Sequence, residues 1–277
     1  MLSQILKAPE WRIQKAPNNE AAIELLRSTR FDLILTGAGS SGKEDVELLR
    51  RIRRVHPHTC MIIVADESAP ADVIAAMREG AFSYFSRPFS LQALGDMVRN
   101  ATEAPCWDDG IEVLPGAPNW YRLAARCDIK TADRLLQFVY EMIELPEPEK
   151  EVVASALREL LMNAIEYGGK FDPDKYVEMS YVRTKRAVAC RVKDPGEGFS
   201  LDEISHSAIM NPPDDPLRHV GFREAENMRP GGFGVLLARS SVDELIYTDK
   251  GNEVLLIKYI DSGKQRSNET ENTLRRE

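Results

Sequence analysis

Short apolar runs alternate with segments of helical periodicity through roughly the first hundred residues. The runs are too short for helices, while the segments between them place apolar residues three and four apart. Alternation of this kind predicts a parallel α/β sheet with helices on its faces. The expected strands are Trp11–Lys15, Leu33–Thr36, Cys60–Ala65 and Ser83–Ser86, and the expected helices are Asn19–Ser28, Lys43–Val55, Ala71–Glu79 and Leu91–Ala101.

The pattern changes after a Pro- and Gly-rich stretch, and the second half indicates an α+β domain. A helix that follows the N-cap candidate Asp128 and a helix around Glu159 come first. The later apolar runs alternate as strands do. The expected strands are Tyr176–Val182, Ala187–Val192, Val242–Tyr247 and Gly251–Lys258, the first two as a hairpin. We therefore predict domains over 1–103 and 120–262, a linker over 104–119, and a disordered polar tail over 263–277.

Composition narrows the class of protein. The net charge of −8 over 277 residues disfavours nucleic acid as a principal partner, because phosphate neutralisation needs a basic surface. No run of about 18 apolar residues is present, so we expect no membrane span. The four cysteines (Cys60, Cys106, Cys127 and Cys190) are scattered. We expect them to be reduced, as in a cytoplasmic protein.

Three polar motifs in the second half carry the candidate chemistry. Glu159 and Asn163 lie four apart in an expected helix, so both project from one face. A carboxylate there is able to accept a proton from an attacking hydroxyl, and a neutral amide oxygen suits Mg²⁺. Residues 193–199, Lys-Asp-Pro-Gly-Glu-Gly-Phe, place Asp194 in a turn with Gly196 and Gly198. Such glycines allow the backbone to approach a ligand closely.

The third motif, residues 229–234, is Arg-Pro-Gly-Gly-Phe-Gly, in which Gly232 and Gly234 lead into an apolar helical stretch. Backbone N–H groups at a helix start favour phosphate. In this order and spacing, the three motifs resemble the N box and the two glycine boxes of the histidine-kinase/gyrase-type ATPase fold, an α+β Bergerat-type sandwich. From about Trp120 to Ile260 the layout is similar to bacterial anti-sigma-factor serine/threonine kinases.

That resemblance implies roles for the motif residues. Glu159 would be the catalytic base, Asn163 the Mg²⁺ ligand and Asp194 the group that binds adenine. The glycines at 196, 198, 232 and 234 would surround ATP. The implied partners are an anti-sigma antagonist of the STAS type, a sigma factor, and a second copy of the chain in a homodimer.

The stretch Ser200–Pro230 departs from the family, because it takes the place of a nucleotide lid that is expected to be shorter. Its basic residues are Arg218, His219, Arg223 and Arg229. They either reach phosphates or belong to a solvated loop. His206 and His219 have no zinc-type spacing with cysteine, and we expect loop positions for both.

Other functions fit the same motifs. A sensor histidine kinase needs a phosphoaccepting His on a helical hairpin, and His56 and His58 lie in a Val-His-Pro-His loop instead. A non-catalytic switch, in which ATP orders the 200–230 lid for a partner, remains the alternative to the kinase. ATP hydrolysis without protein phosphorylation is a third reading.

Two segments of the first domain are distinctive: residues 31–36, Phe-Asp-Leu-Ile-Leu-Thr, and residues 79–89, with their Gly-Ala-x-x-Tyr-x-x-x-Pro-Phe pattern. Together they resemble response-regulator receivers. This resemblance implies a flavodoxin-like sheet. Gly37 stands where the phosphoacceptor Asp belongs, Ala65 or Asp66 replaces the hydroxyl residue, and Arg87 replaces Lys. We therefore expect a pseudo-receiver that docks or dimerises rather than a phosphate switch.

The order 2-1-3-4-5 makes the first receiver strand central, and we expect this strand to be missing from the chain, either naturally or because the start is clipped or misassigned. We expect either that Trp11–Lys15 pairs directly with Leu33–Thr36 or that another chain completes the edge. Tyr84 and Phe89 are candidates for a contact surface or for core packing.

Overall fold

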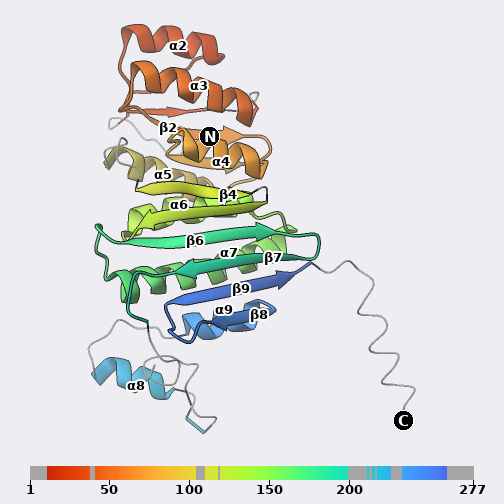
Figure 1. The fold of residues 1–277 in the computed structure, drawn as a ribbon. Coiled ribbons are helices and arrows are strands. Elements are labelled where there is room, and N and C mark those ends of the chain that lie inside the picture. The colour runs from red at the N-terminus through yellow and green to blue at the C-terminus, as the bar shows by residue number, and fades with distance from the viewer. Residues whose placement is uncertain are drawn as a thin grey trace. The chain divides into compact units, whose positions relative to one another are not determined.

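The computed structural model describes residues 11–37, 41–103, 110–117, 119–198, 211, 214–215, 217–225 and 233–260 (Figure 1). The chain forms two compact units. The first consists of Met1–Val113 with Asp128–Ile143, and the second of Leu114–Cys127 with Glu144–Glu277. The fold class agrees with the prediction, because the first unit holds a parallel sheet and the second an antiparallel one.

The first unit is a three-stranded parallel sheet in the order β1-β2-β3. Its strands are β1 (Leu33–Leu35), β2 (Cys60–Ala65) and β3 (Ser83–Ser86). Its helices include α2 (Asn19–Ser28), α3 (Gly42–Val55), α4 (Pro70–Arg78) and α5 (Leu91–Glu103). Capping residues determine where two of these helices begin: the Asn18 side chain caps α2, and Ser41 with Glu44 forms a capping box on α3. These bounds confirm the four predicted helices and three of the predicted strands.

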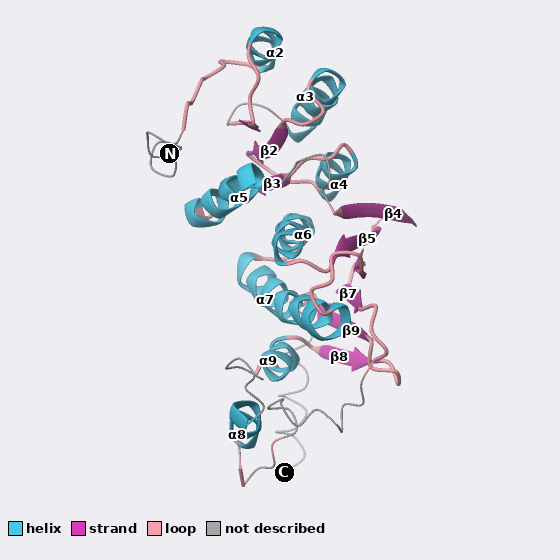
Figure 2. Ribbon diagram, turned by 90° about the vertical axis from the view of Figure 1, so that its left-hand side faces the viewer, coloured by secondary structure: helices cyan, strands magenta, loops and turns pink. Residues whose placement is uncertain are grey.

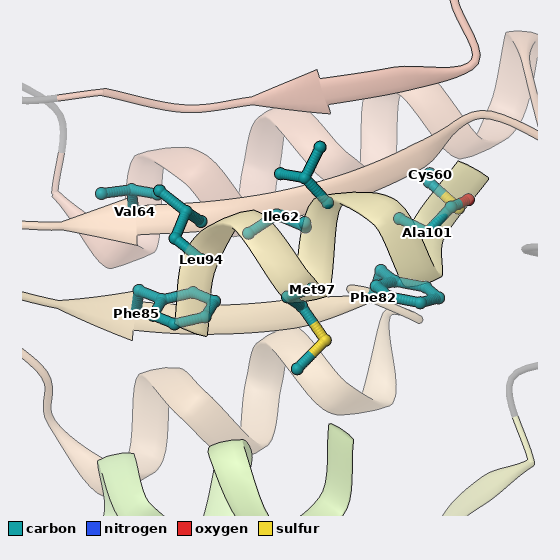
Figure 3. Close-up of a cluster of buried hydrophobic side chains, with 9 residues drawn as sticks. Cys60, Ile62, Val64, Phe82, Phe85, Leu94, Met97 and Ala101 are labelled. Carbon is teal, nitrogen blue, oxygen red and sulfur yellow. The ribbon is translucent and has the colours of Figure 1, made fainter. Parts of the chain in front are cut away.

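The core of this unit lies between the sheet and α5. β2 is buried along its whole length, and the side chains of Ile62 and Val64 pack with those of Leu94 and Met97 (Figure 3). Helix α5 covers one face of the sheet, while α3 and α4 lie on the other (Figure 2). Wholly apolar strands of this kind are typical of a sheet covered on both faces.

Both contact-surface candidates are used for packing. Tyr84 is fully buried, with its hydroxyl against Gly42, where a Cβ would lie 2.5 Å from Oη. Phe89 packs against the α5 core, edge-on to Phe85 with ring centroids 5.8 Å apart.

The predicted strand Trp11–Lys15 is wrong. These residues have no regular secondary structure, and in the described part of the chain β1 pairs only with β2. The physical reason is the indole of Trp11, which packs against the α5 core beside Leu33 and Leu35. The apolar signal at Trp11 therefore reflects side-chain burial from a loop. Completion of the β1 edge by another chain stays a prediction.

The second unit contains a mainly antiparallel sheet in the order β4-β5-β6-β7-β9-β8. Its strands are β4 (Ile111–Ala117), β5 (Trp120–Arg126), β6 (Tyr176–Arg183), β7 (Ala187–Lys193), β8 (Glu244–Tyr247) and β9 (Glu253–Tyr259). The expected β6–β7 hairpin is confirmed. Strand β4 lies inside the segment expected to be a linker.

Helices of the second unit cover one face of this sheet. They include α7 (Glu147–Asn163), the π-helix η1 (Ala164–Gly169) and α9 (Gly234–Ser241). Helix α8 (Arg218–Ala225) also belongs to this unit. Alternate residues of β7 are buried, and α7 and α9 lie side by side along that layer (Figure 2). Alternation of this kind is typical of a sheet with one covered face.

Helix α6 (Ile129–Met142) belongs to the first unit, although it follows β5 in sequence. It packs against β3 and α4. The Asp128 side chain caps its first turn by accepting from the Thr131 backbone N–H at 2.8 Å.

The expectation of reduced cysteines is wrong for Cys60, which is disulfide-bonded. Cys127 and Cys190 are free and buried. Burial raises the pKa of Cys190 to about 12, so its thiol stays protonated. Within the described ranges, no helix combines the length and the apolar character that a membrane crossing needs. The expected tail after 262 lies outside the described residues.

Candidate nucleotide site

The first and third motifs meet where α7 packs against α9. A Cβ on Gly234 would lie 2.2 Å from Oε2 of Glu159, so any larger residue there would displace this carboxylate from the start of α9. Phe233 occupies the N-cap of α9, and its side chain makes no capping hydrogen bond. The first N–H groups of α9 therefore form a donor set close to Glu159.

Asn163 lies at the point where α7 changes into the π-helix η1. It is half-buried, one turn beyond Glu159. The wider turn continues to Gly169 and ends at Lys170 and Phe171, whose φ values are +58° and +53°. Short π-helical segments inside α-helices occur frequently at functional sites.

The π-helix brings Gly168 against Asp194. A Cβ on Gly168 would lie 2.2 Å from Asp194 Oδ1, and a Cβ on Gly196 would lie 2.8 Å from the same atom. The first two motifs therefore meet around one carboxylate. Because neither glycine has a Cβ, the backbone of both segments packs directly against this carboxylate.

Asp194 follows directly after β7 and is held by backbone hydrogen bonds. Its Oδ1 accepts from the Gly196 N–H at 2.7 Å, and its own N–H donates to the Asn252 carbonyl at 3.0 Å. Burial raises the pKa of Asp194 above its ordinary value, although the Gly196 N–H and the Lys250 ammonium act in the opposite direction. A half-buried carboxylate of this kind is suited to accept from an amine.

Gly198 holds the loop to the β8–β9 turn. Its φ is +92°, and a Cβ there would lie 1.8 Å from the Lys250 carbonyl oxygen. Both facts require glycine. The structure therefore gives Gly198 a role in shaping the loop that carries Asp194.

Three neighbours of Asp194 were not predicted as site residues. Gly168 lies five residues after Asn163, in the π-helix. Asn252 is 9% exposed, and its Nδ2 donates to the Gly196 carbonyl at 3.5 Å. Burial, with Asp194 nearby, raises the pKa of Tyr247 to about 12. The only sequence signal for the last two is their position around a Gly-Asn turn between two apolar runs.

Gly232 lies outside the described residues, as do His206, Arg229 and most of the expected lid. Of that lid, α8 carries His219, which is buried, and its ring meets that of Phe233 edge-on at 4.4 Å. The His219 N–H also donates to Asn211 Oδ1 at 3.0 Å. His219 is thus a packing residue between α8 and the start of α9. Among the described residues, no group of three or more His, Cys, Asp or Glu side chains forms a metal site.

In the first unit, Gly37 follows the end of β1, and Thr36 Oγ1 accepts from the Val64 N–H at 2.8 Å. Arg87 forms an ion pair with Asp66 at 3.1 Å. The residues that replace the expected hydroxyl and lysine therefore bind each other at the carboxyl end of this sheet.

Comparison with known families also divides the chain in two, but it places α6 with the second domain. Residues 124–258 match the histidine kinase-like ATPase domain, and residues 1–99 match the response regulator receiver domain. The chain therefore contains a histidine kinase-like ATPase domain fused to a response regulator receiver domain. Such an ATPase domain implies ATP as the nucleotide, and the combination indicates a bacterial signalling protein.

Individual relatives are response regulators or transcriptional regulators. The chain is 33% identical over 79 residues to the response regulator protein FleR of Pseudomonas aeruginosa, which covers 28% of this chain and 17% of the relative. It is 25% identical over 119 residues to the probable transcriptional regulatory protein TcrX of Mycobacterium tuberculosis, covering 42% and 51%. The chain thus spans about half or less of these relatives.

Among solved structures, a response regulator from Thermotoga maritima is similar over 37% of this chain and 85% of its own, with 25% identity and a TM-score of 0.34.

Proposed function

We propose that this chain is an ATP-dependent serine/threonine protein kinase of the anti-sigma type, acting on a STAS-like antagonist and binding a sigma factor. The observation that carries the proposal is the position of Glu159. Its carboxylate lies against Gly234 at the start of α9, on the helix that also carries Asn163 and leads to Gly168 beside Asp194. The proposed base lies on α7, the proposed phosphate donors at the start of α9 contact that base, and the proposed adenine acceptor contacts the π-helical end of α7.

The residues present fit an adenine nucleotide. The half-buried Asp194 carboxylate is suited to accept from the exocyclic amine, and the glycines at 168 and 196 pack against it and fix its position. Asn163 supplies a hard amide oxygen for Mg²⁺. Because no carboxylate cluster surrounds Asn163 in the described part of the chain, phosphate oxygens and water would complete the coordination.

Mg²⁺–ATP, when bound, supplies the transferable phosphoryl group. Glu159 accepts the proton of the attacking hydroxyl while the hydroxyl oxygen bonds to the γ-phosphorus. At the same time the bond between the γ-phosphorus and the β–γ bridging oxygen breaks. The N–H groups at the start of α9 donate to phosphate oxygens, which stabilises the charge that moves onto the leaving ADP. The Gly234 contact brings the base and these donors together.

We infer further that the receiver domain is a pseudo-receiver. Gly37 offers no nucleophile at the expected acceptor position, and Arg87 is engaged by Asp66. Signals would therefore reach this domain by docking rather than by phosphorylation.

Replacing Glu159 by Ala tests the kinase, with Glu151→Ala as the matched control on the exposed part of α7. Loss of a general base lowers transfer by about 10²–10⁴-fold. We therefore expect E159A to bind ATP as the parent does but to lose phosphate transfer to STAS-domain proteins encoded in the same genome. Labelled ATP and calorimetry report the two quantities. Transfer by E159A at the parental rate would exclude Glu159 as the base.

A non-catalytic switch is the second candidate, and the His219–Phe233 contact favours it. Phe233 directly precedes Gly234, so a nucleotide at the start of α9 would act on α8 through this contact. If E159A loses transfer yet still controls the partner in response to ATP, the switch describes the protein better than the kinase.

A further inference from the structure

The outer edge of β3 is bound by side chains of α6. Among the described strands β3 pairs only with β2, so its other edge presents backbone groups that need partners when buried. Arg134 Nε donates to the Phe82 carbonyl at 2.9 Å, and Gln137 Nε2 donates to the Tyr84 carbonyl at 2.9 Å. At the end of the strand, Glu141 accepts from the Ser86 N–H at 3.1 Å.

These three contacts follow the strand in order. Residues 134, 137 and 141 share one face of a helix. They span about 10 Å along the helix axis, and residues 82–86 span about 13 Å along the strand. Helix α6 therefore runs beside β3 in the same direction, and each of its three polar side chains reaches one backbone group of the edge.

The contact is a built interface, because charged groups are buried in it. Arg134 is 5% exposed and Glu141 is 4% exposed. The Arg134 guanidinium also lies 4.2 Å from the centre of the Phe82 ring, and Glu141 accepts from the Ser86 hydroxyl as well as from Gln137 Nε2. Buried charges are costly unless they are hydrogen-bonded, so this face of α6 is matched to the β3 edge.

Helix α6 is also linked closely to the candidate site through the chain. Three residues after Glu141, the Glu144 N–H donates to Tyr181 Oη at 3.3 Å, within the second unit. Helix α7, which carries Glu159, begins at Glu147. The chain therefore has only a few residues in which to absorb a movement of α6 before it reaches these elements.

We propose that the receiver domain is a docking module whose ligand is the chain's own α6, bound along the β3 edge by Arg134, Gln137 and Glu141. Through α6, this docking sets the nucleotide affinity of the ATPase domain. The second statement rests on the proposed function, while the docking itself does not. A domain without phosphorylation chemistry would in this way retain a defined task.

Hydrogen exchange of the full-length chain tests the docking. In Glu141→Ala, we expect amide exchange at Ser86 and along α6 to rise by at least about tenfold, because the buried partner of the edge is lost. Ile129→Ala, which changes an exposed residue of the same helix, should leave both unchanged. Unchanged protection at Ser86 in E141A would overturn the docking.

Two further measurements separate the parts of the proposal. If E141A fails to fold, Gln137→Ala and Glu141→Gln are measured instead, since each weakens the contact without leaving a charge or a large cavity. ATP affinity by calorimetry should change at least threefold in the variants that loosen α6. Faster exchange with unchanged affinity would overturn the coupling, whereas absence of ATP binding by the parent would overturn the proposed function and leave the docking result valid.

Discussion

Gly168 lies so close to Asp194 that a Cβ at position 168 would be 2.2 Å from Oδ1. The contact joins the end of the π-helix to the loop after β7, two segments that are distant in sequence. It predicts that Gly168→Ala displaces the Asp194 carboxylate and weakens ATP binding at least about tenfold, which is ~1.4 kcal/mol. Isothermal titration calorimetry measures the change.

A glycine elsewhere supplies the control for that substitution. Within the described residues, a Cβ on Gly221 in α8 would meet nothing within 4 Å. Gly221→Ala should therefore retain affinity and favour the helix slightly. Equal losses in the two variants would contradict the role of Gly168.

The raised pKa of Asp194 predicts a pH dependence of opposite sign for affinity and for stability. Binding of an amine needs the ionised carboxylate, so ATP affinity should fall as the pH decreases toward the raised pKa, above the ordinary 3.8. The folded chain without nucleotide binds this proton more readily than the unfolded chain. The contribution of Asp194 to the free energy of unfolding therefore rises as the pH decreases through the same interval.

Calorimetry and thermal unfolding over a pH series measure the two effects. Asp194→Asn should bind weakly at every pH and should lack this titration. Affinity of the parent that is constant down to pH 4 would argue against the carboxylate as the adenine acceptor.

The core between β2 and α5 predicts a large effect of Leu94. This residue is fully buried in the cluster of Figure 3. Leu94→Ala should destabilise the chain by about 2–5 kcal/mol. Leu91→Ala, three residues earlier and 40% exposed, should change stability by less than about 1 kcal/mol. Urea unfolding compares the two, and similar values would contradict the packing described for α5.

Gly37 offers a direct test of the pseudo-receiver. A Cβ there would meet nothing within 4 Å in the described part of the chain, so Gly37→Asp should fold normally. We expect no phosphorylation of G37D by acetyl phosphate, because no metal-binding cluster is present among the described residues. Mass spectrometry measures the label, and a phosphorylated parent chain would contradict the inference.

Local pattern predicted the elements of the first unit well, because its strands are uninterrupted apolar runs and its helices carry capping residues. β2 and β3 have the predicted bounds. The prediction of a strand at Trp11–Lys15 was wrong because one large aromatic side chain produced the apolar signal. Strand β4 was missed because its Pro115 and Gly116 are typical of a linker.

The candidate site was less accessible to sequence reasoning. The spacing of Glu159 and Asn163 indicates a shared helix face, but it does not reveal that Gly234 packs on the carboxylate. The Gly168–Asp194 contact depends on a π-helix, for which the sequence carried no signal. Similarly, the apolar pattern of α6 predicts burial without naming β3 as its neighbour, and Arg134 and Glu141 are of types that are usually exposed.

The grouping of α6 with β3 has a consequence for dissecting the protein. A cut anywhere in residues 104–119 leaves β3 on one fragment and α6 on the other. The first fragment then exposes backbone groups of the β3 edge to water, and the second exposes the charged side chains of α6. Neither fragment would correspond to an independent folding unit. Mixed together, the two halves carry complementary surfaces and should reassemble, as split proteins do.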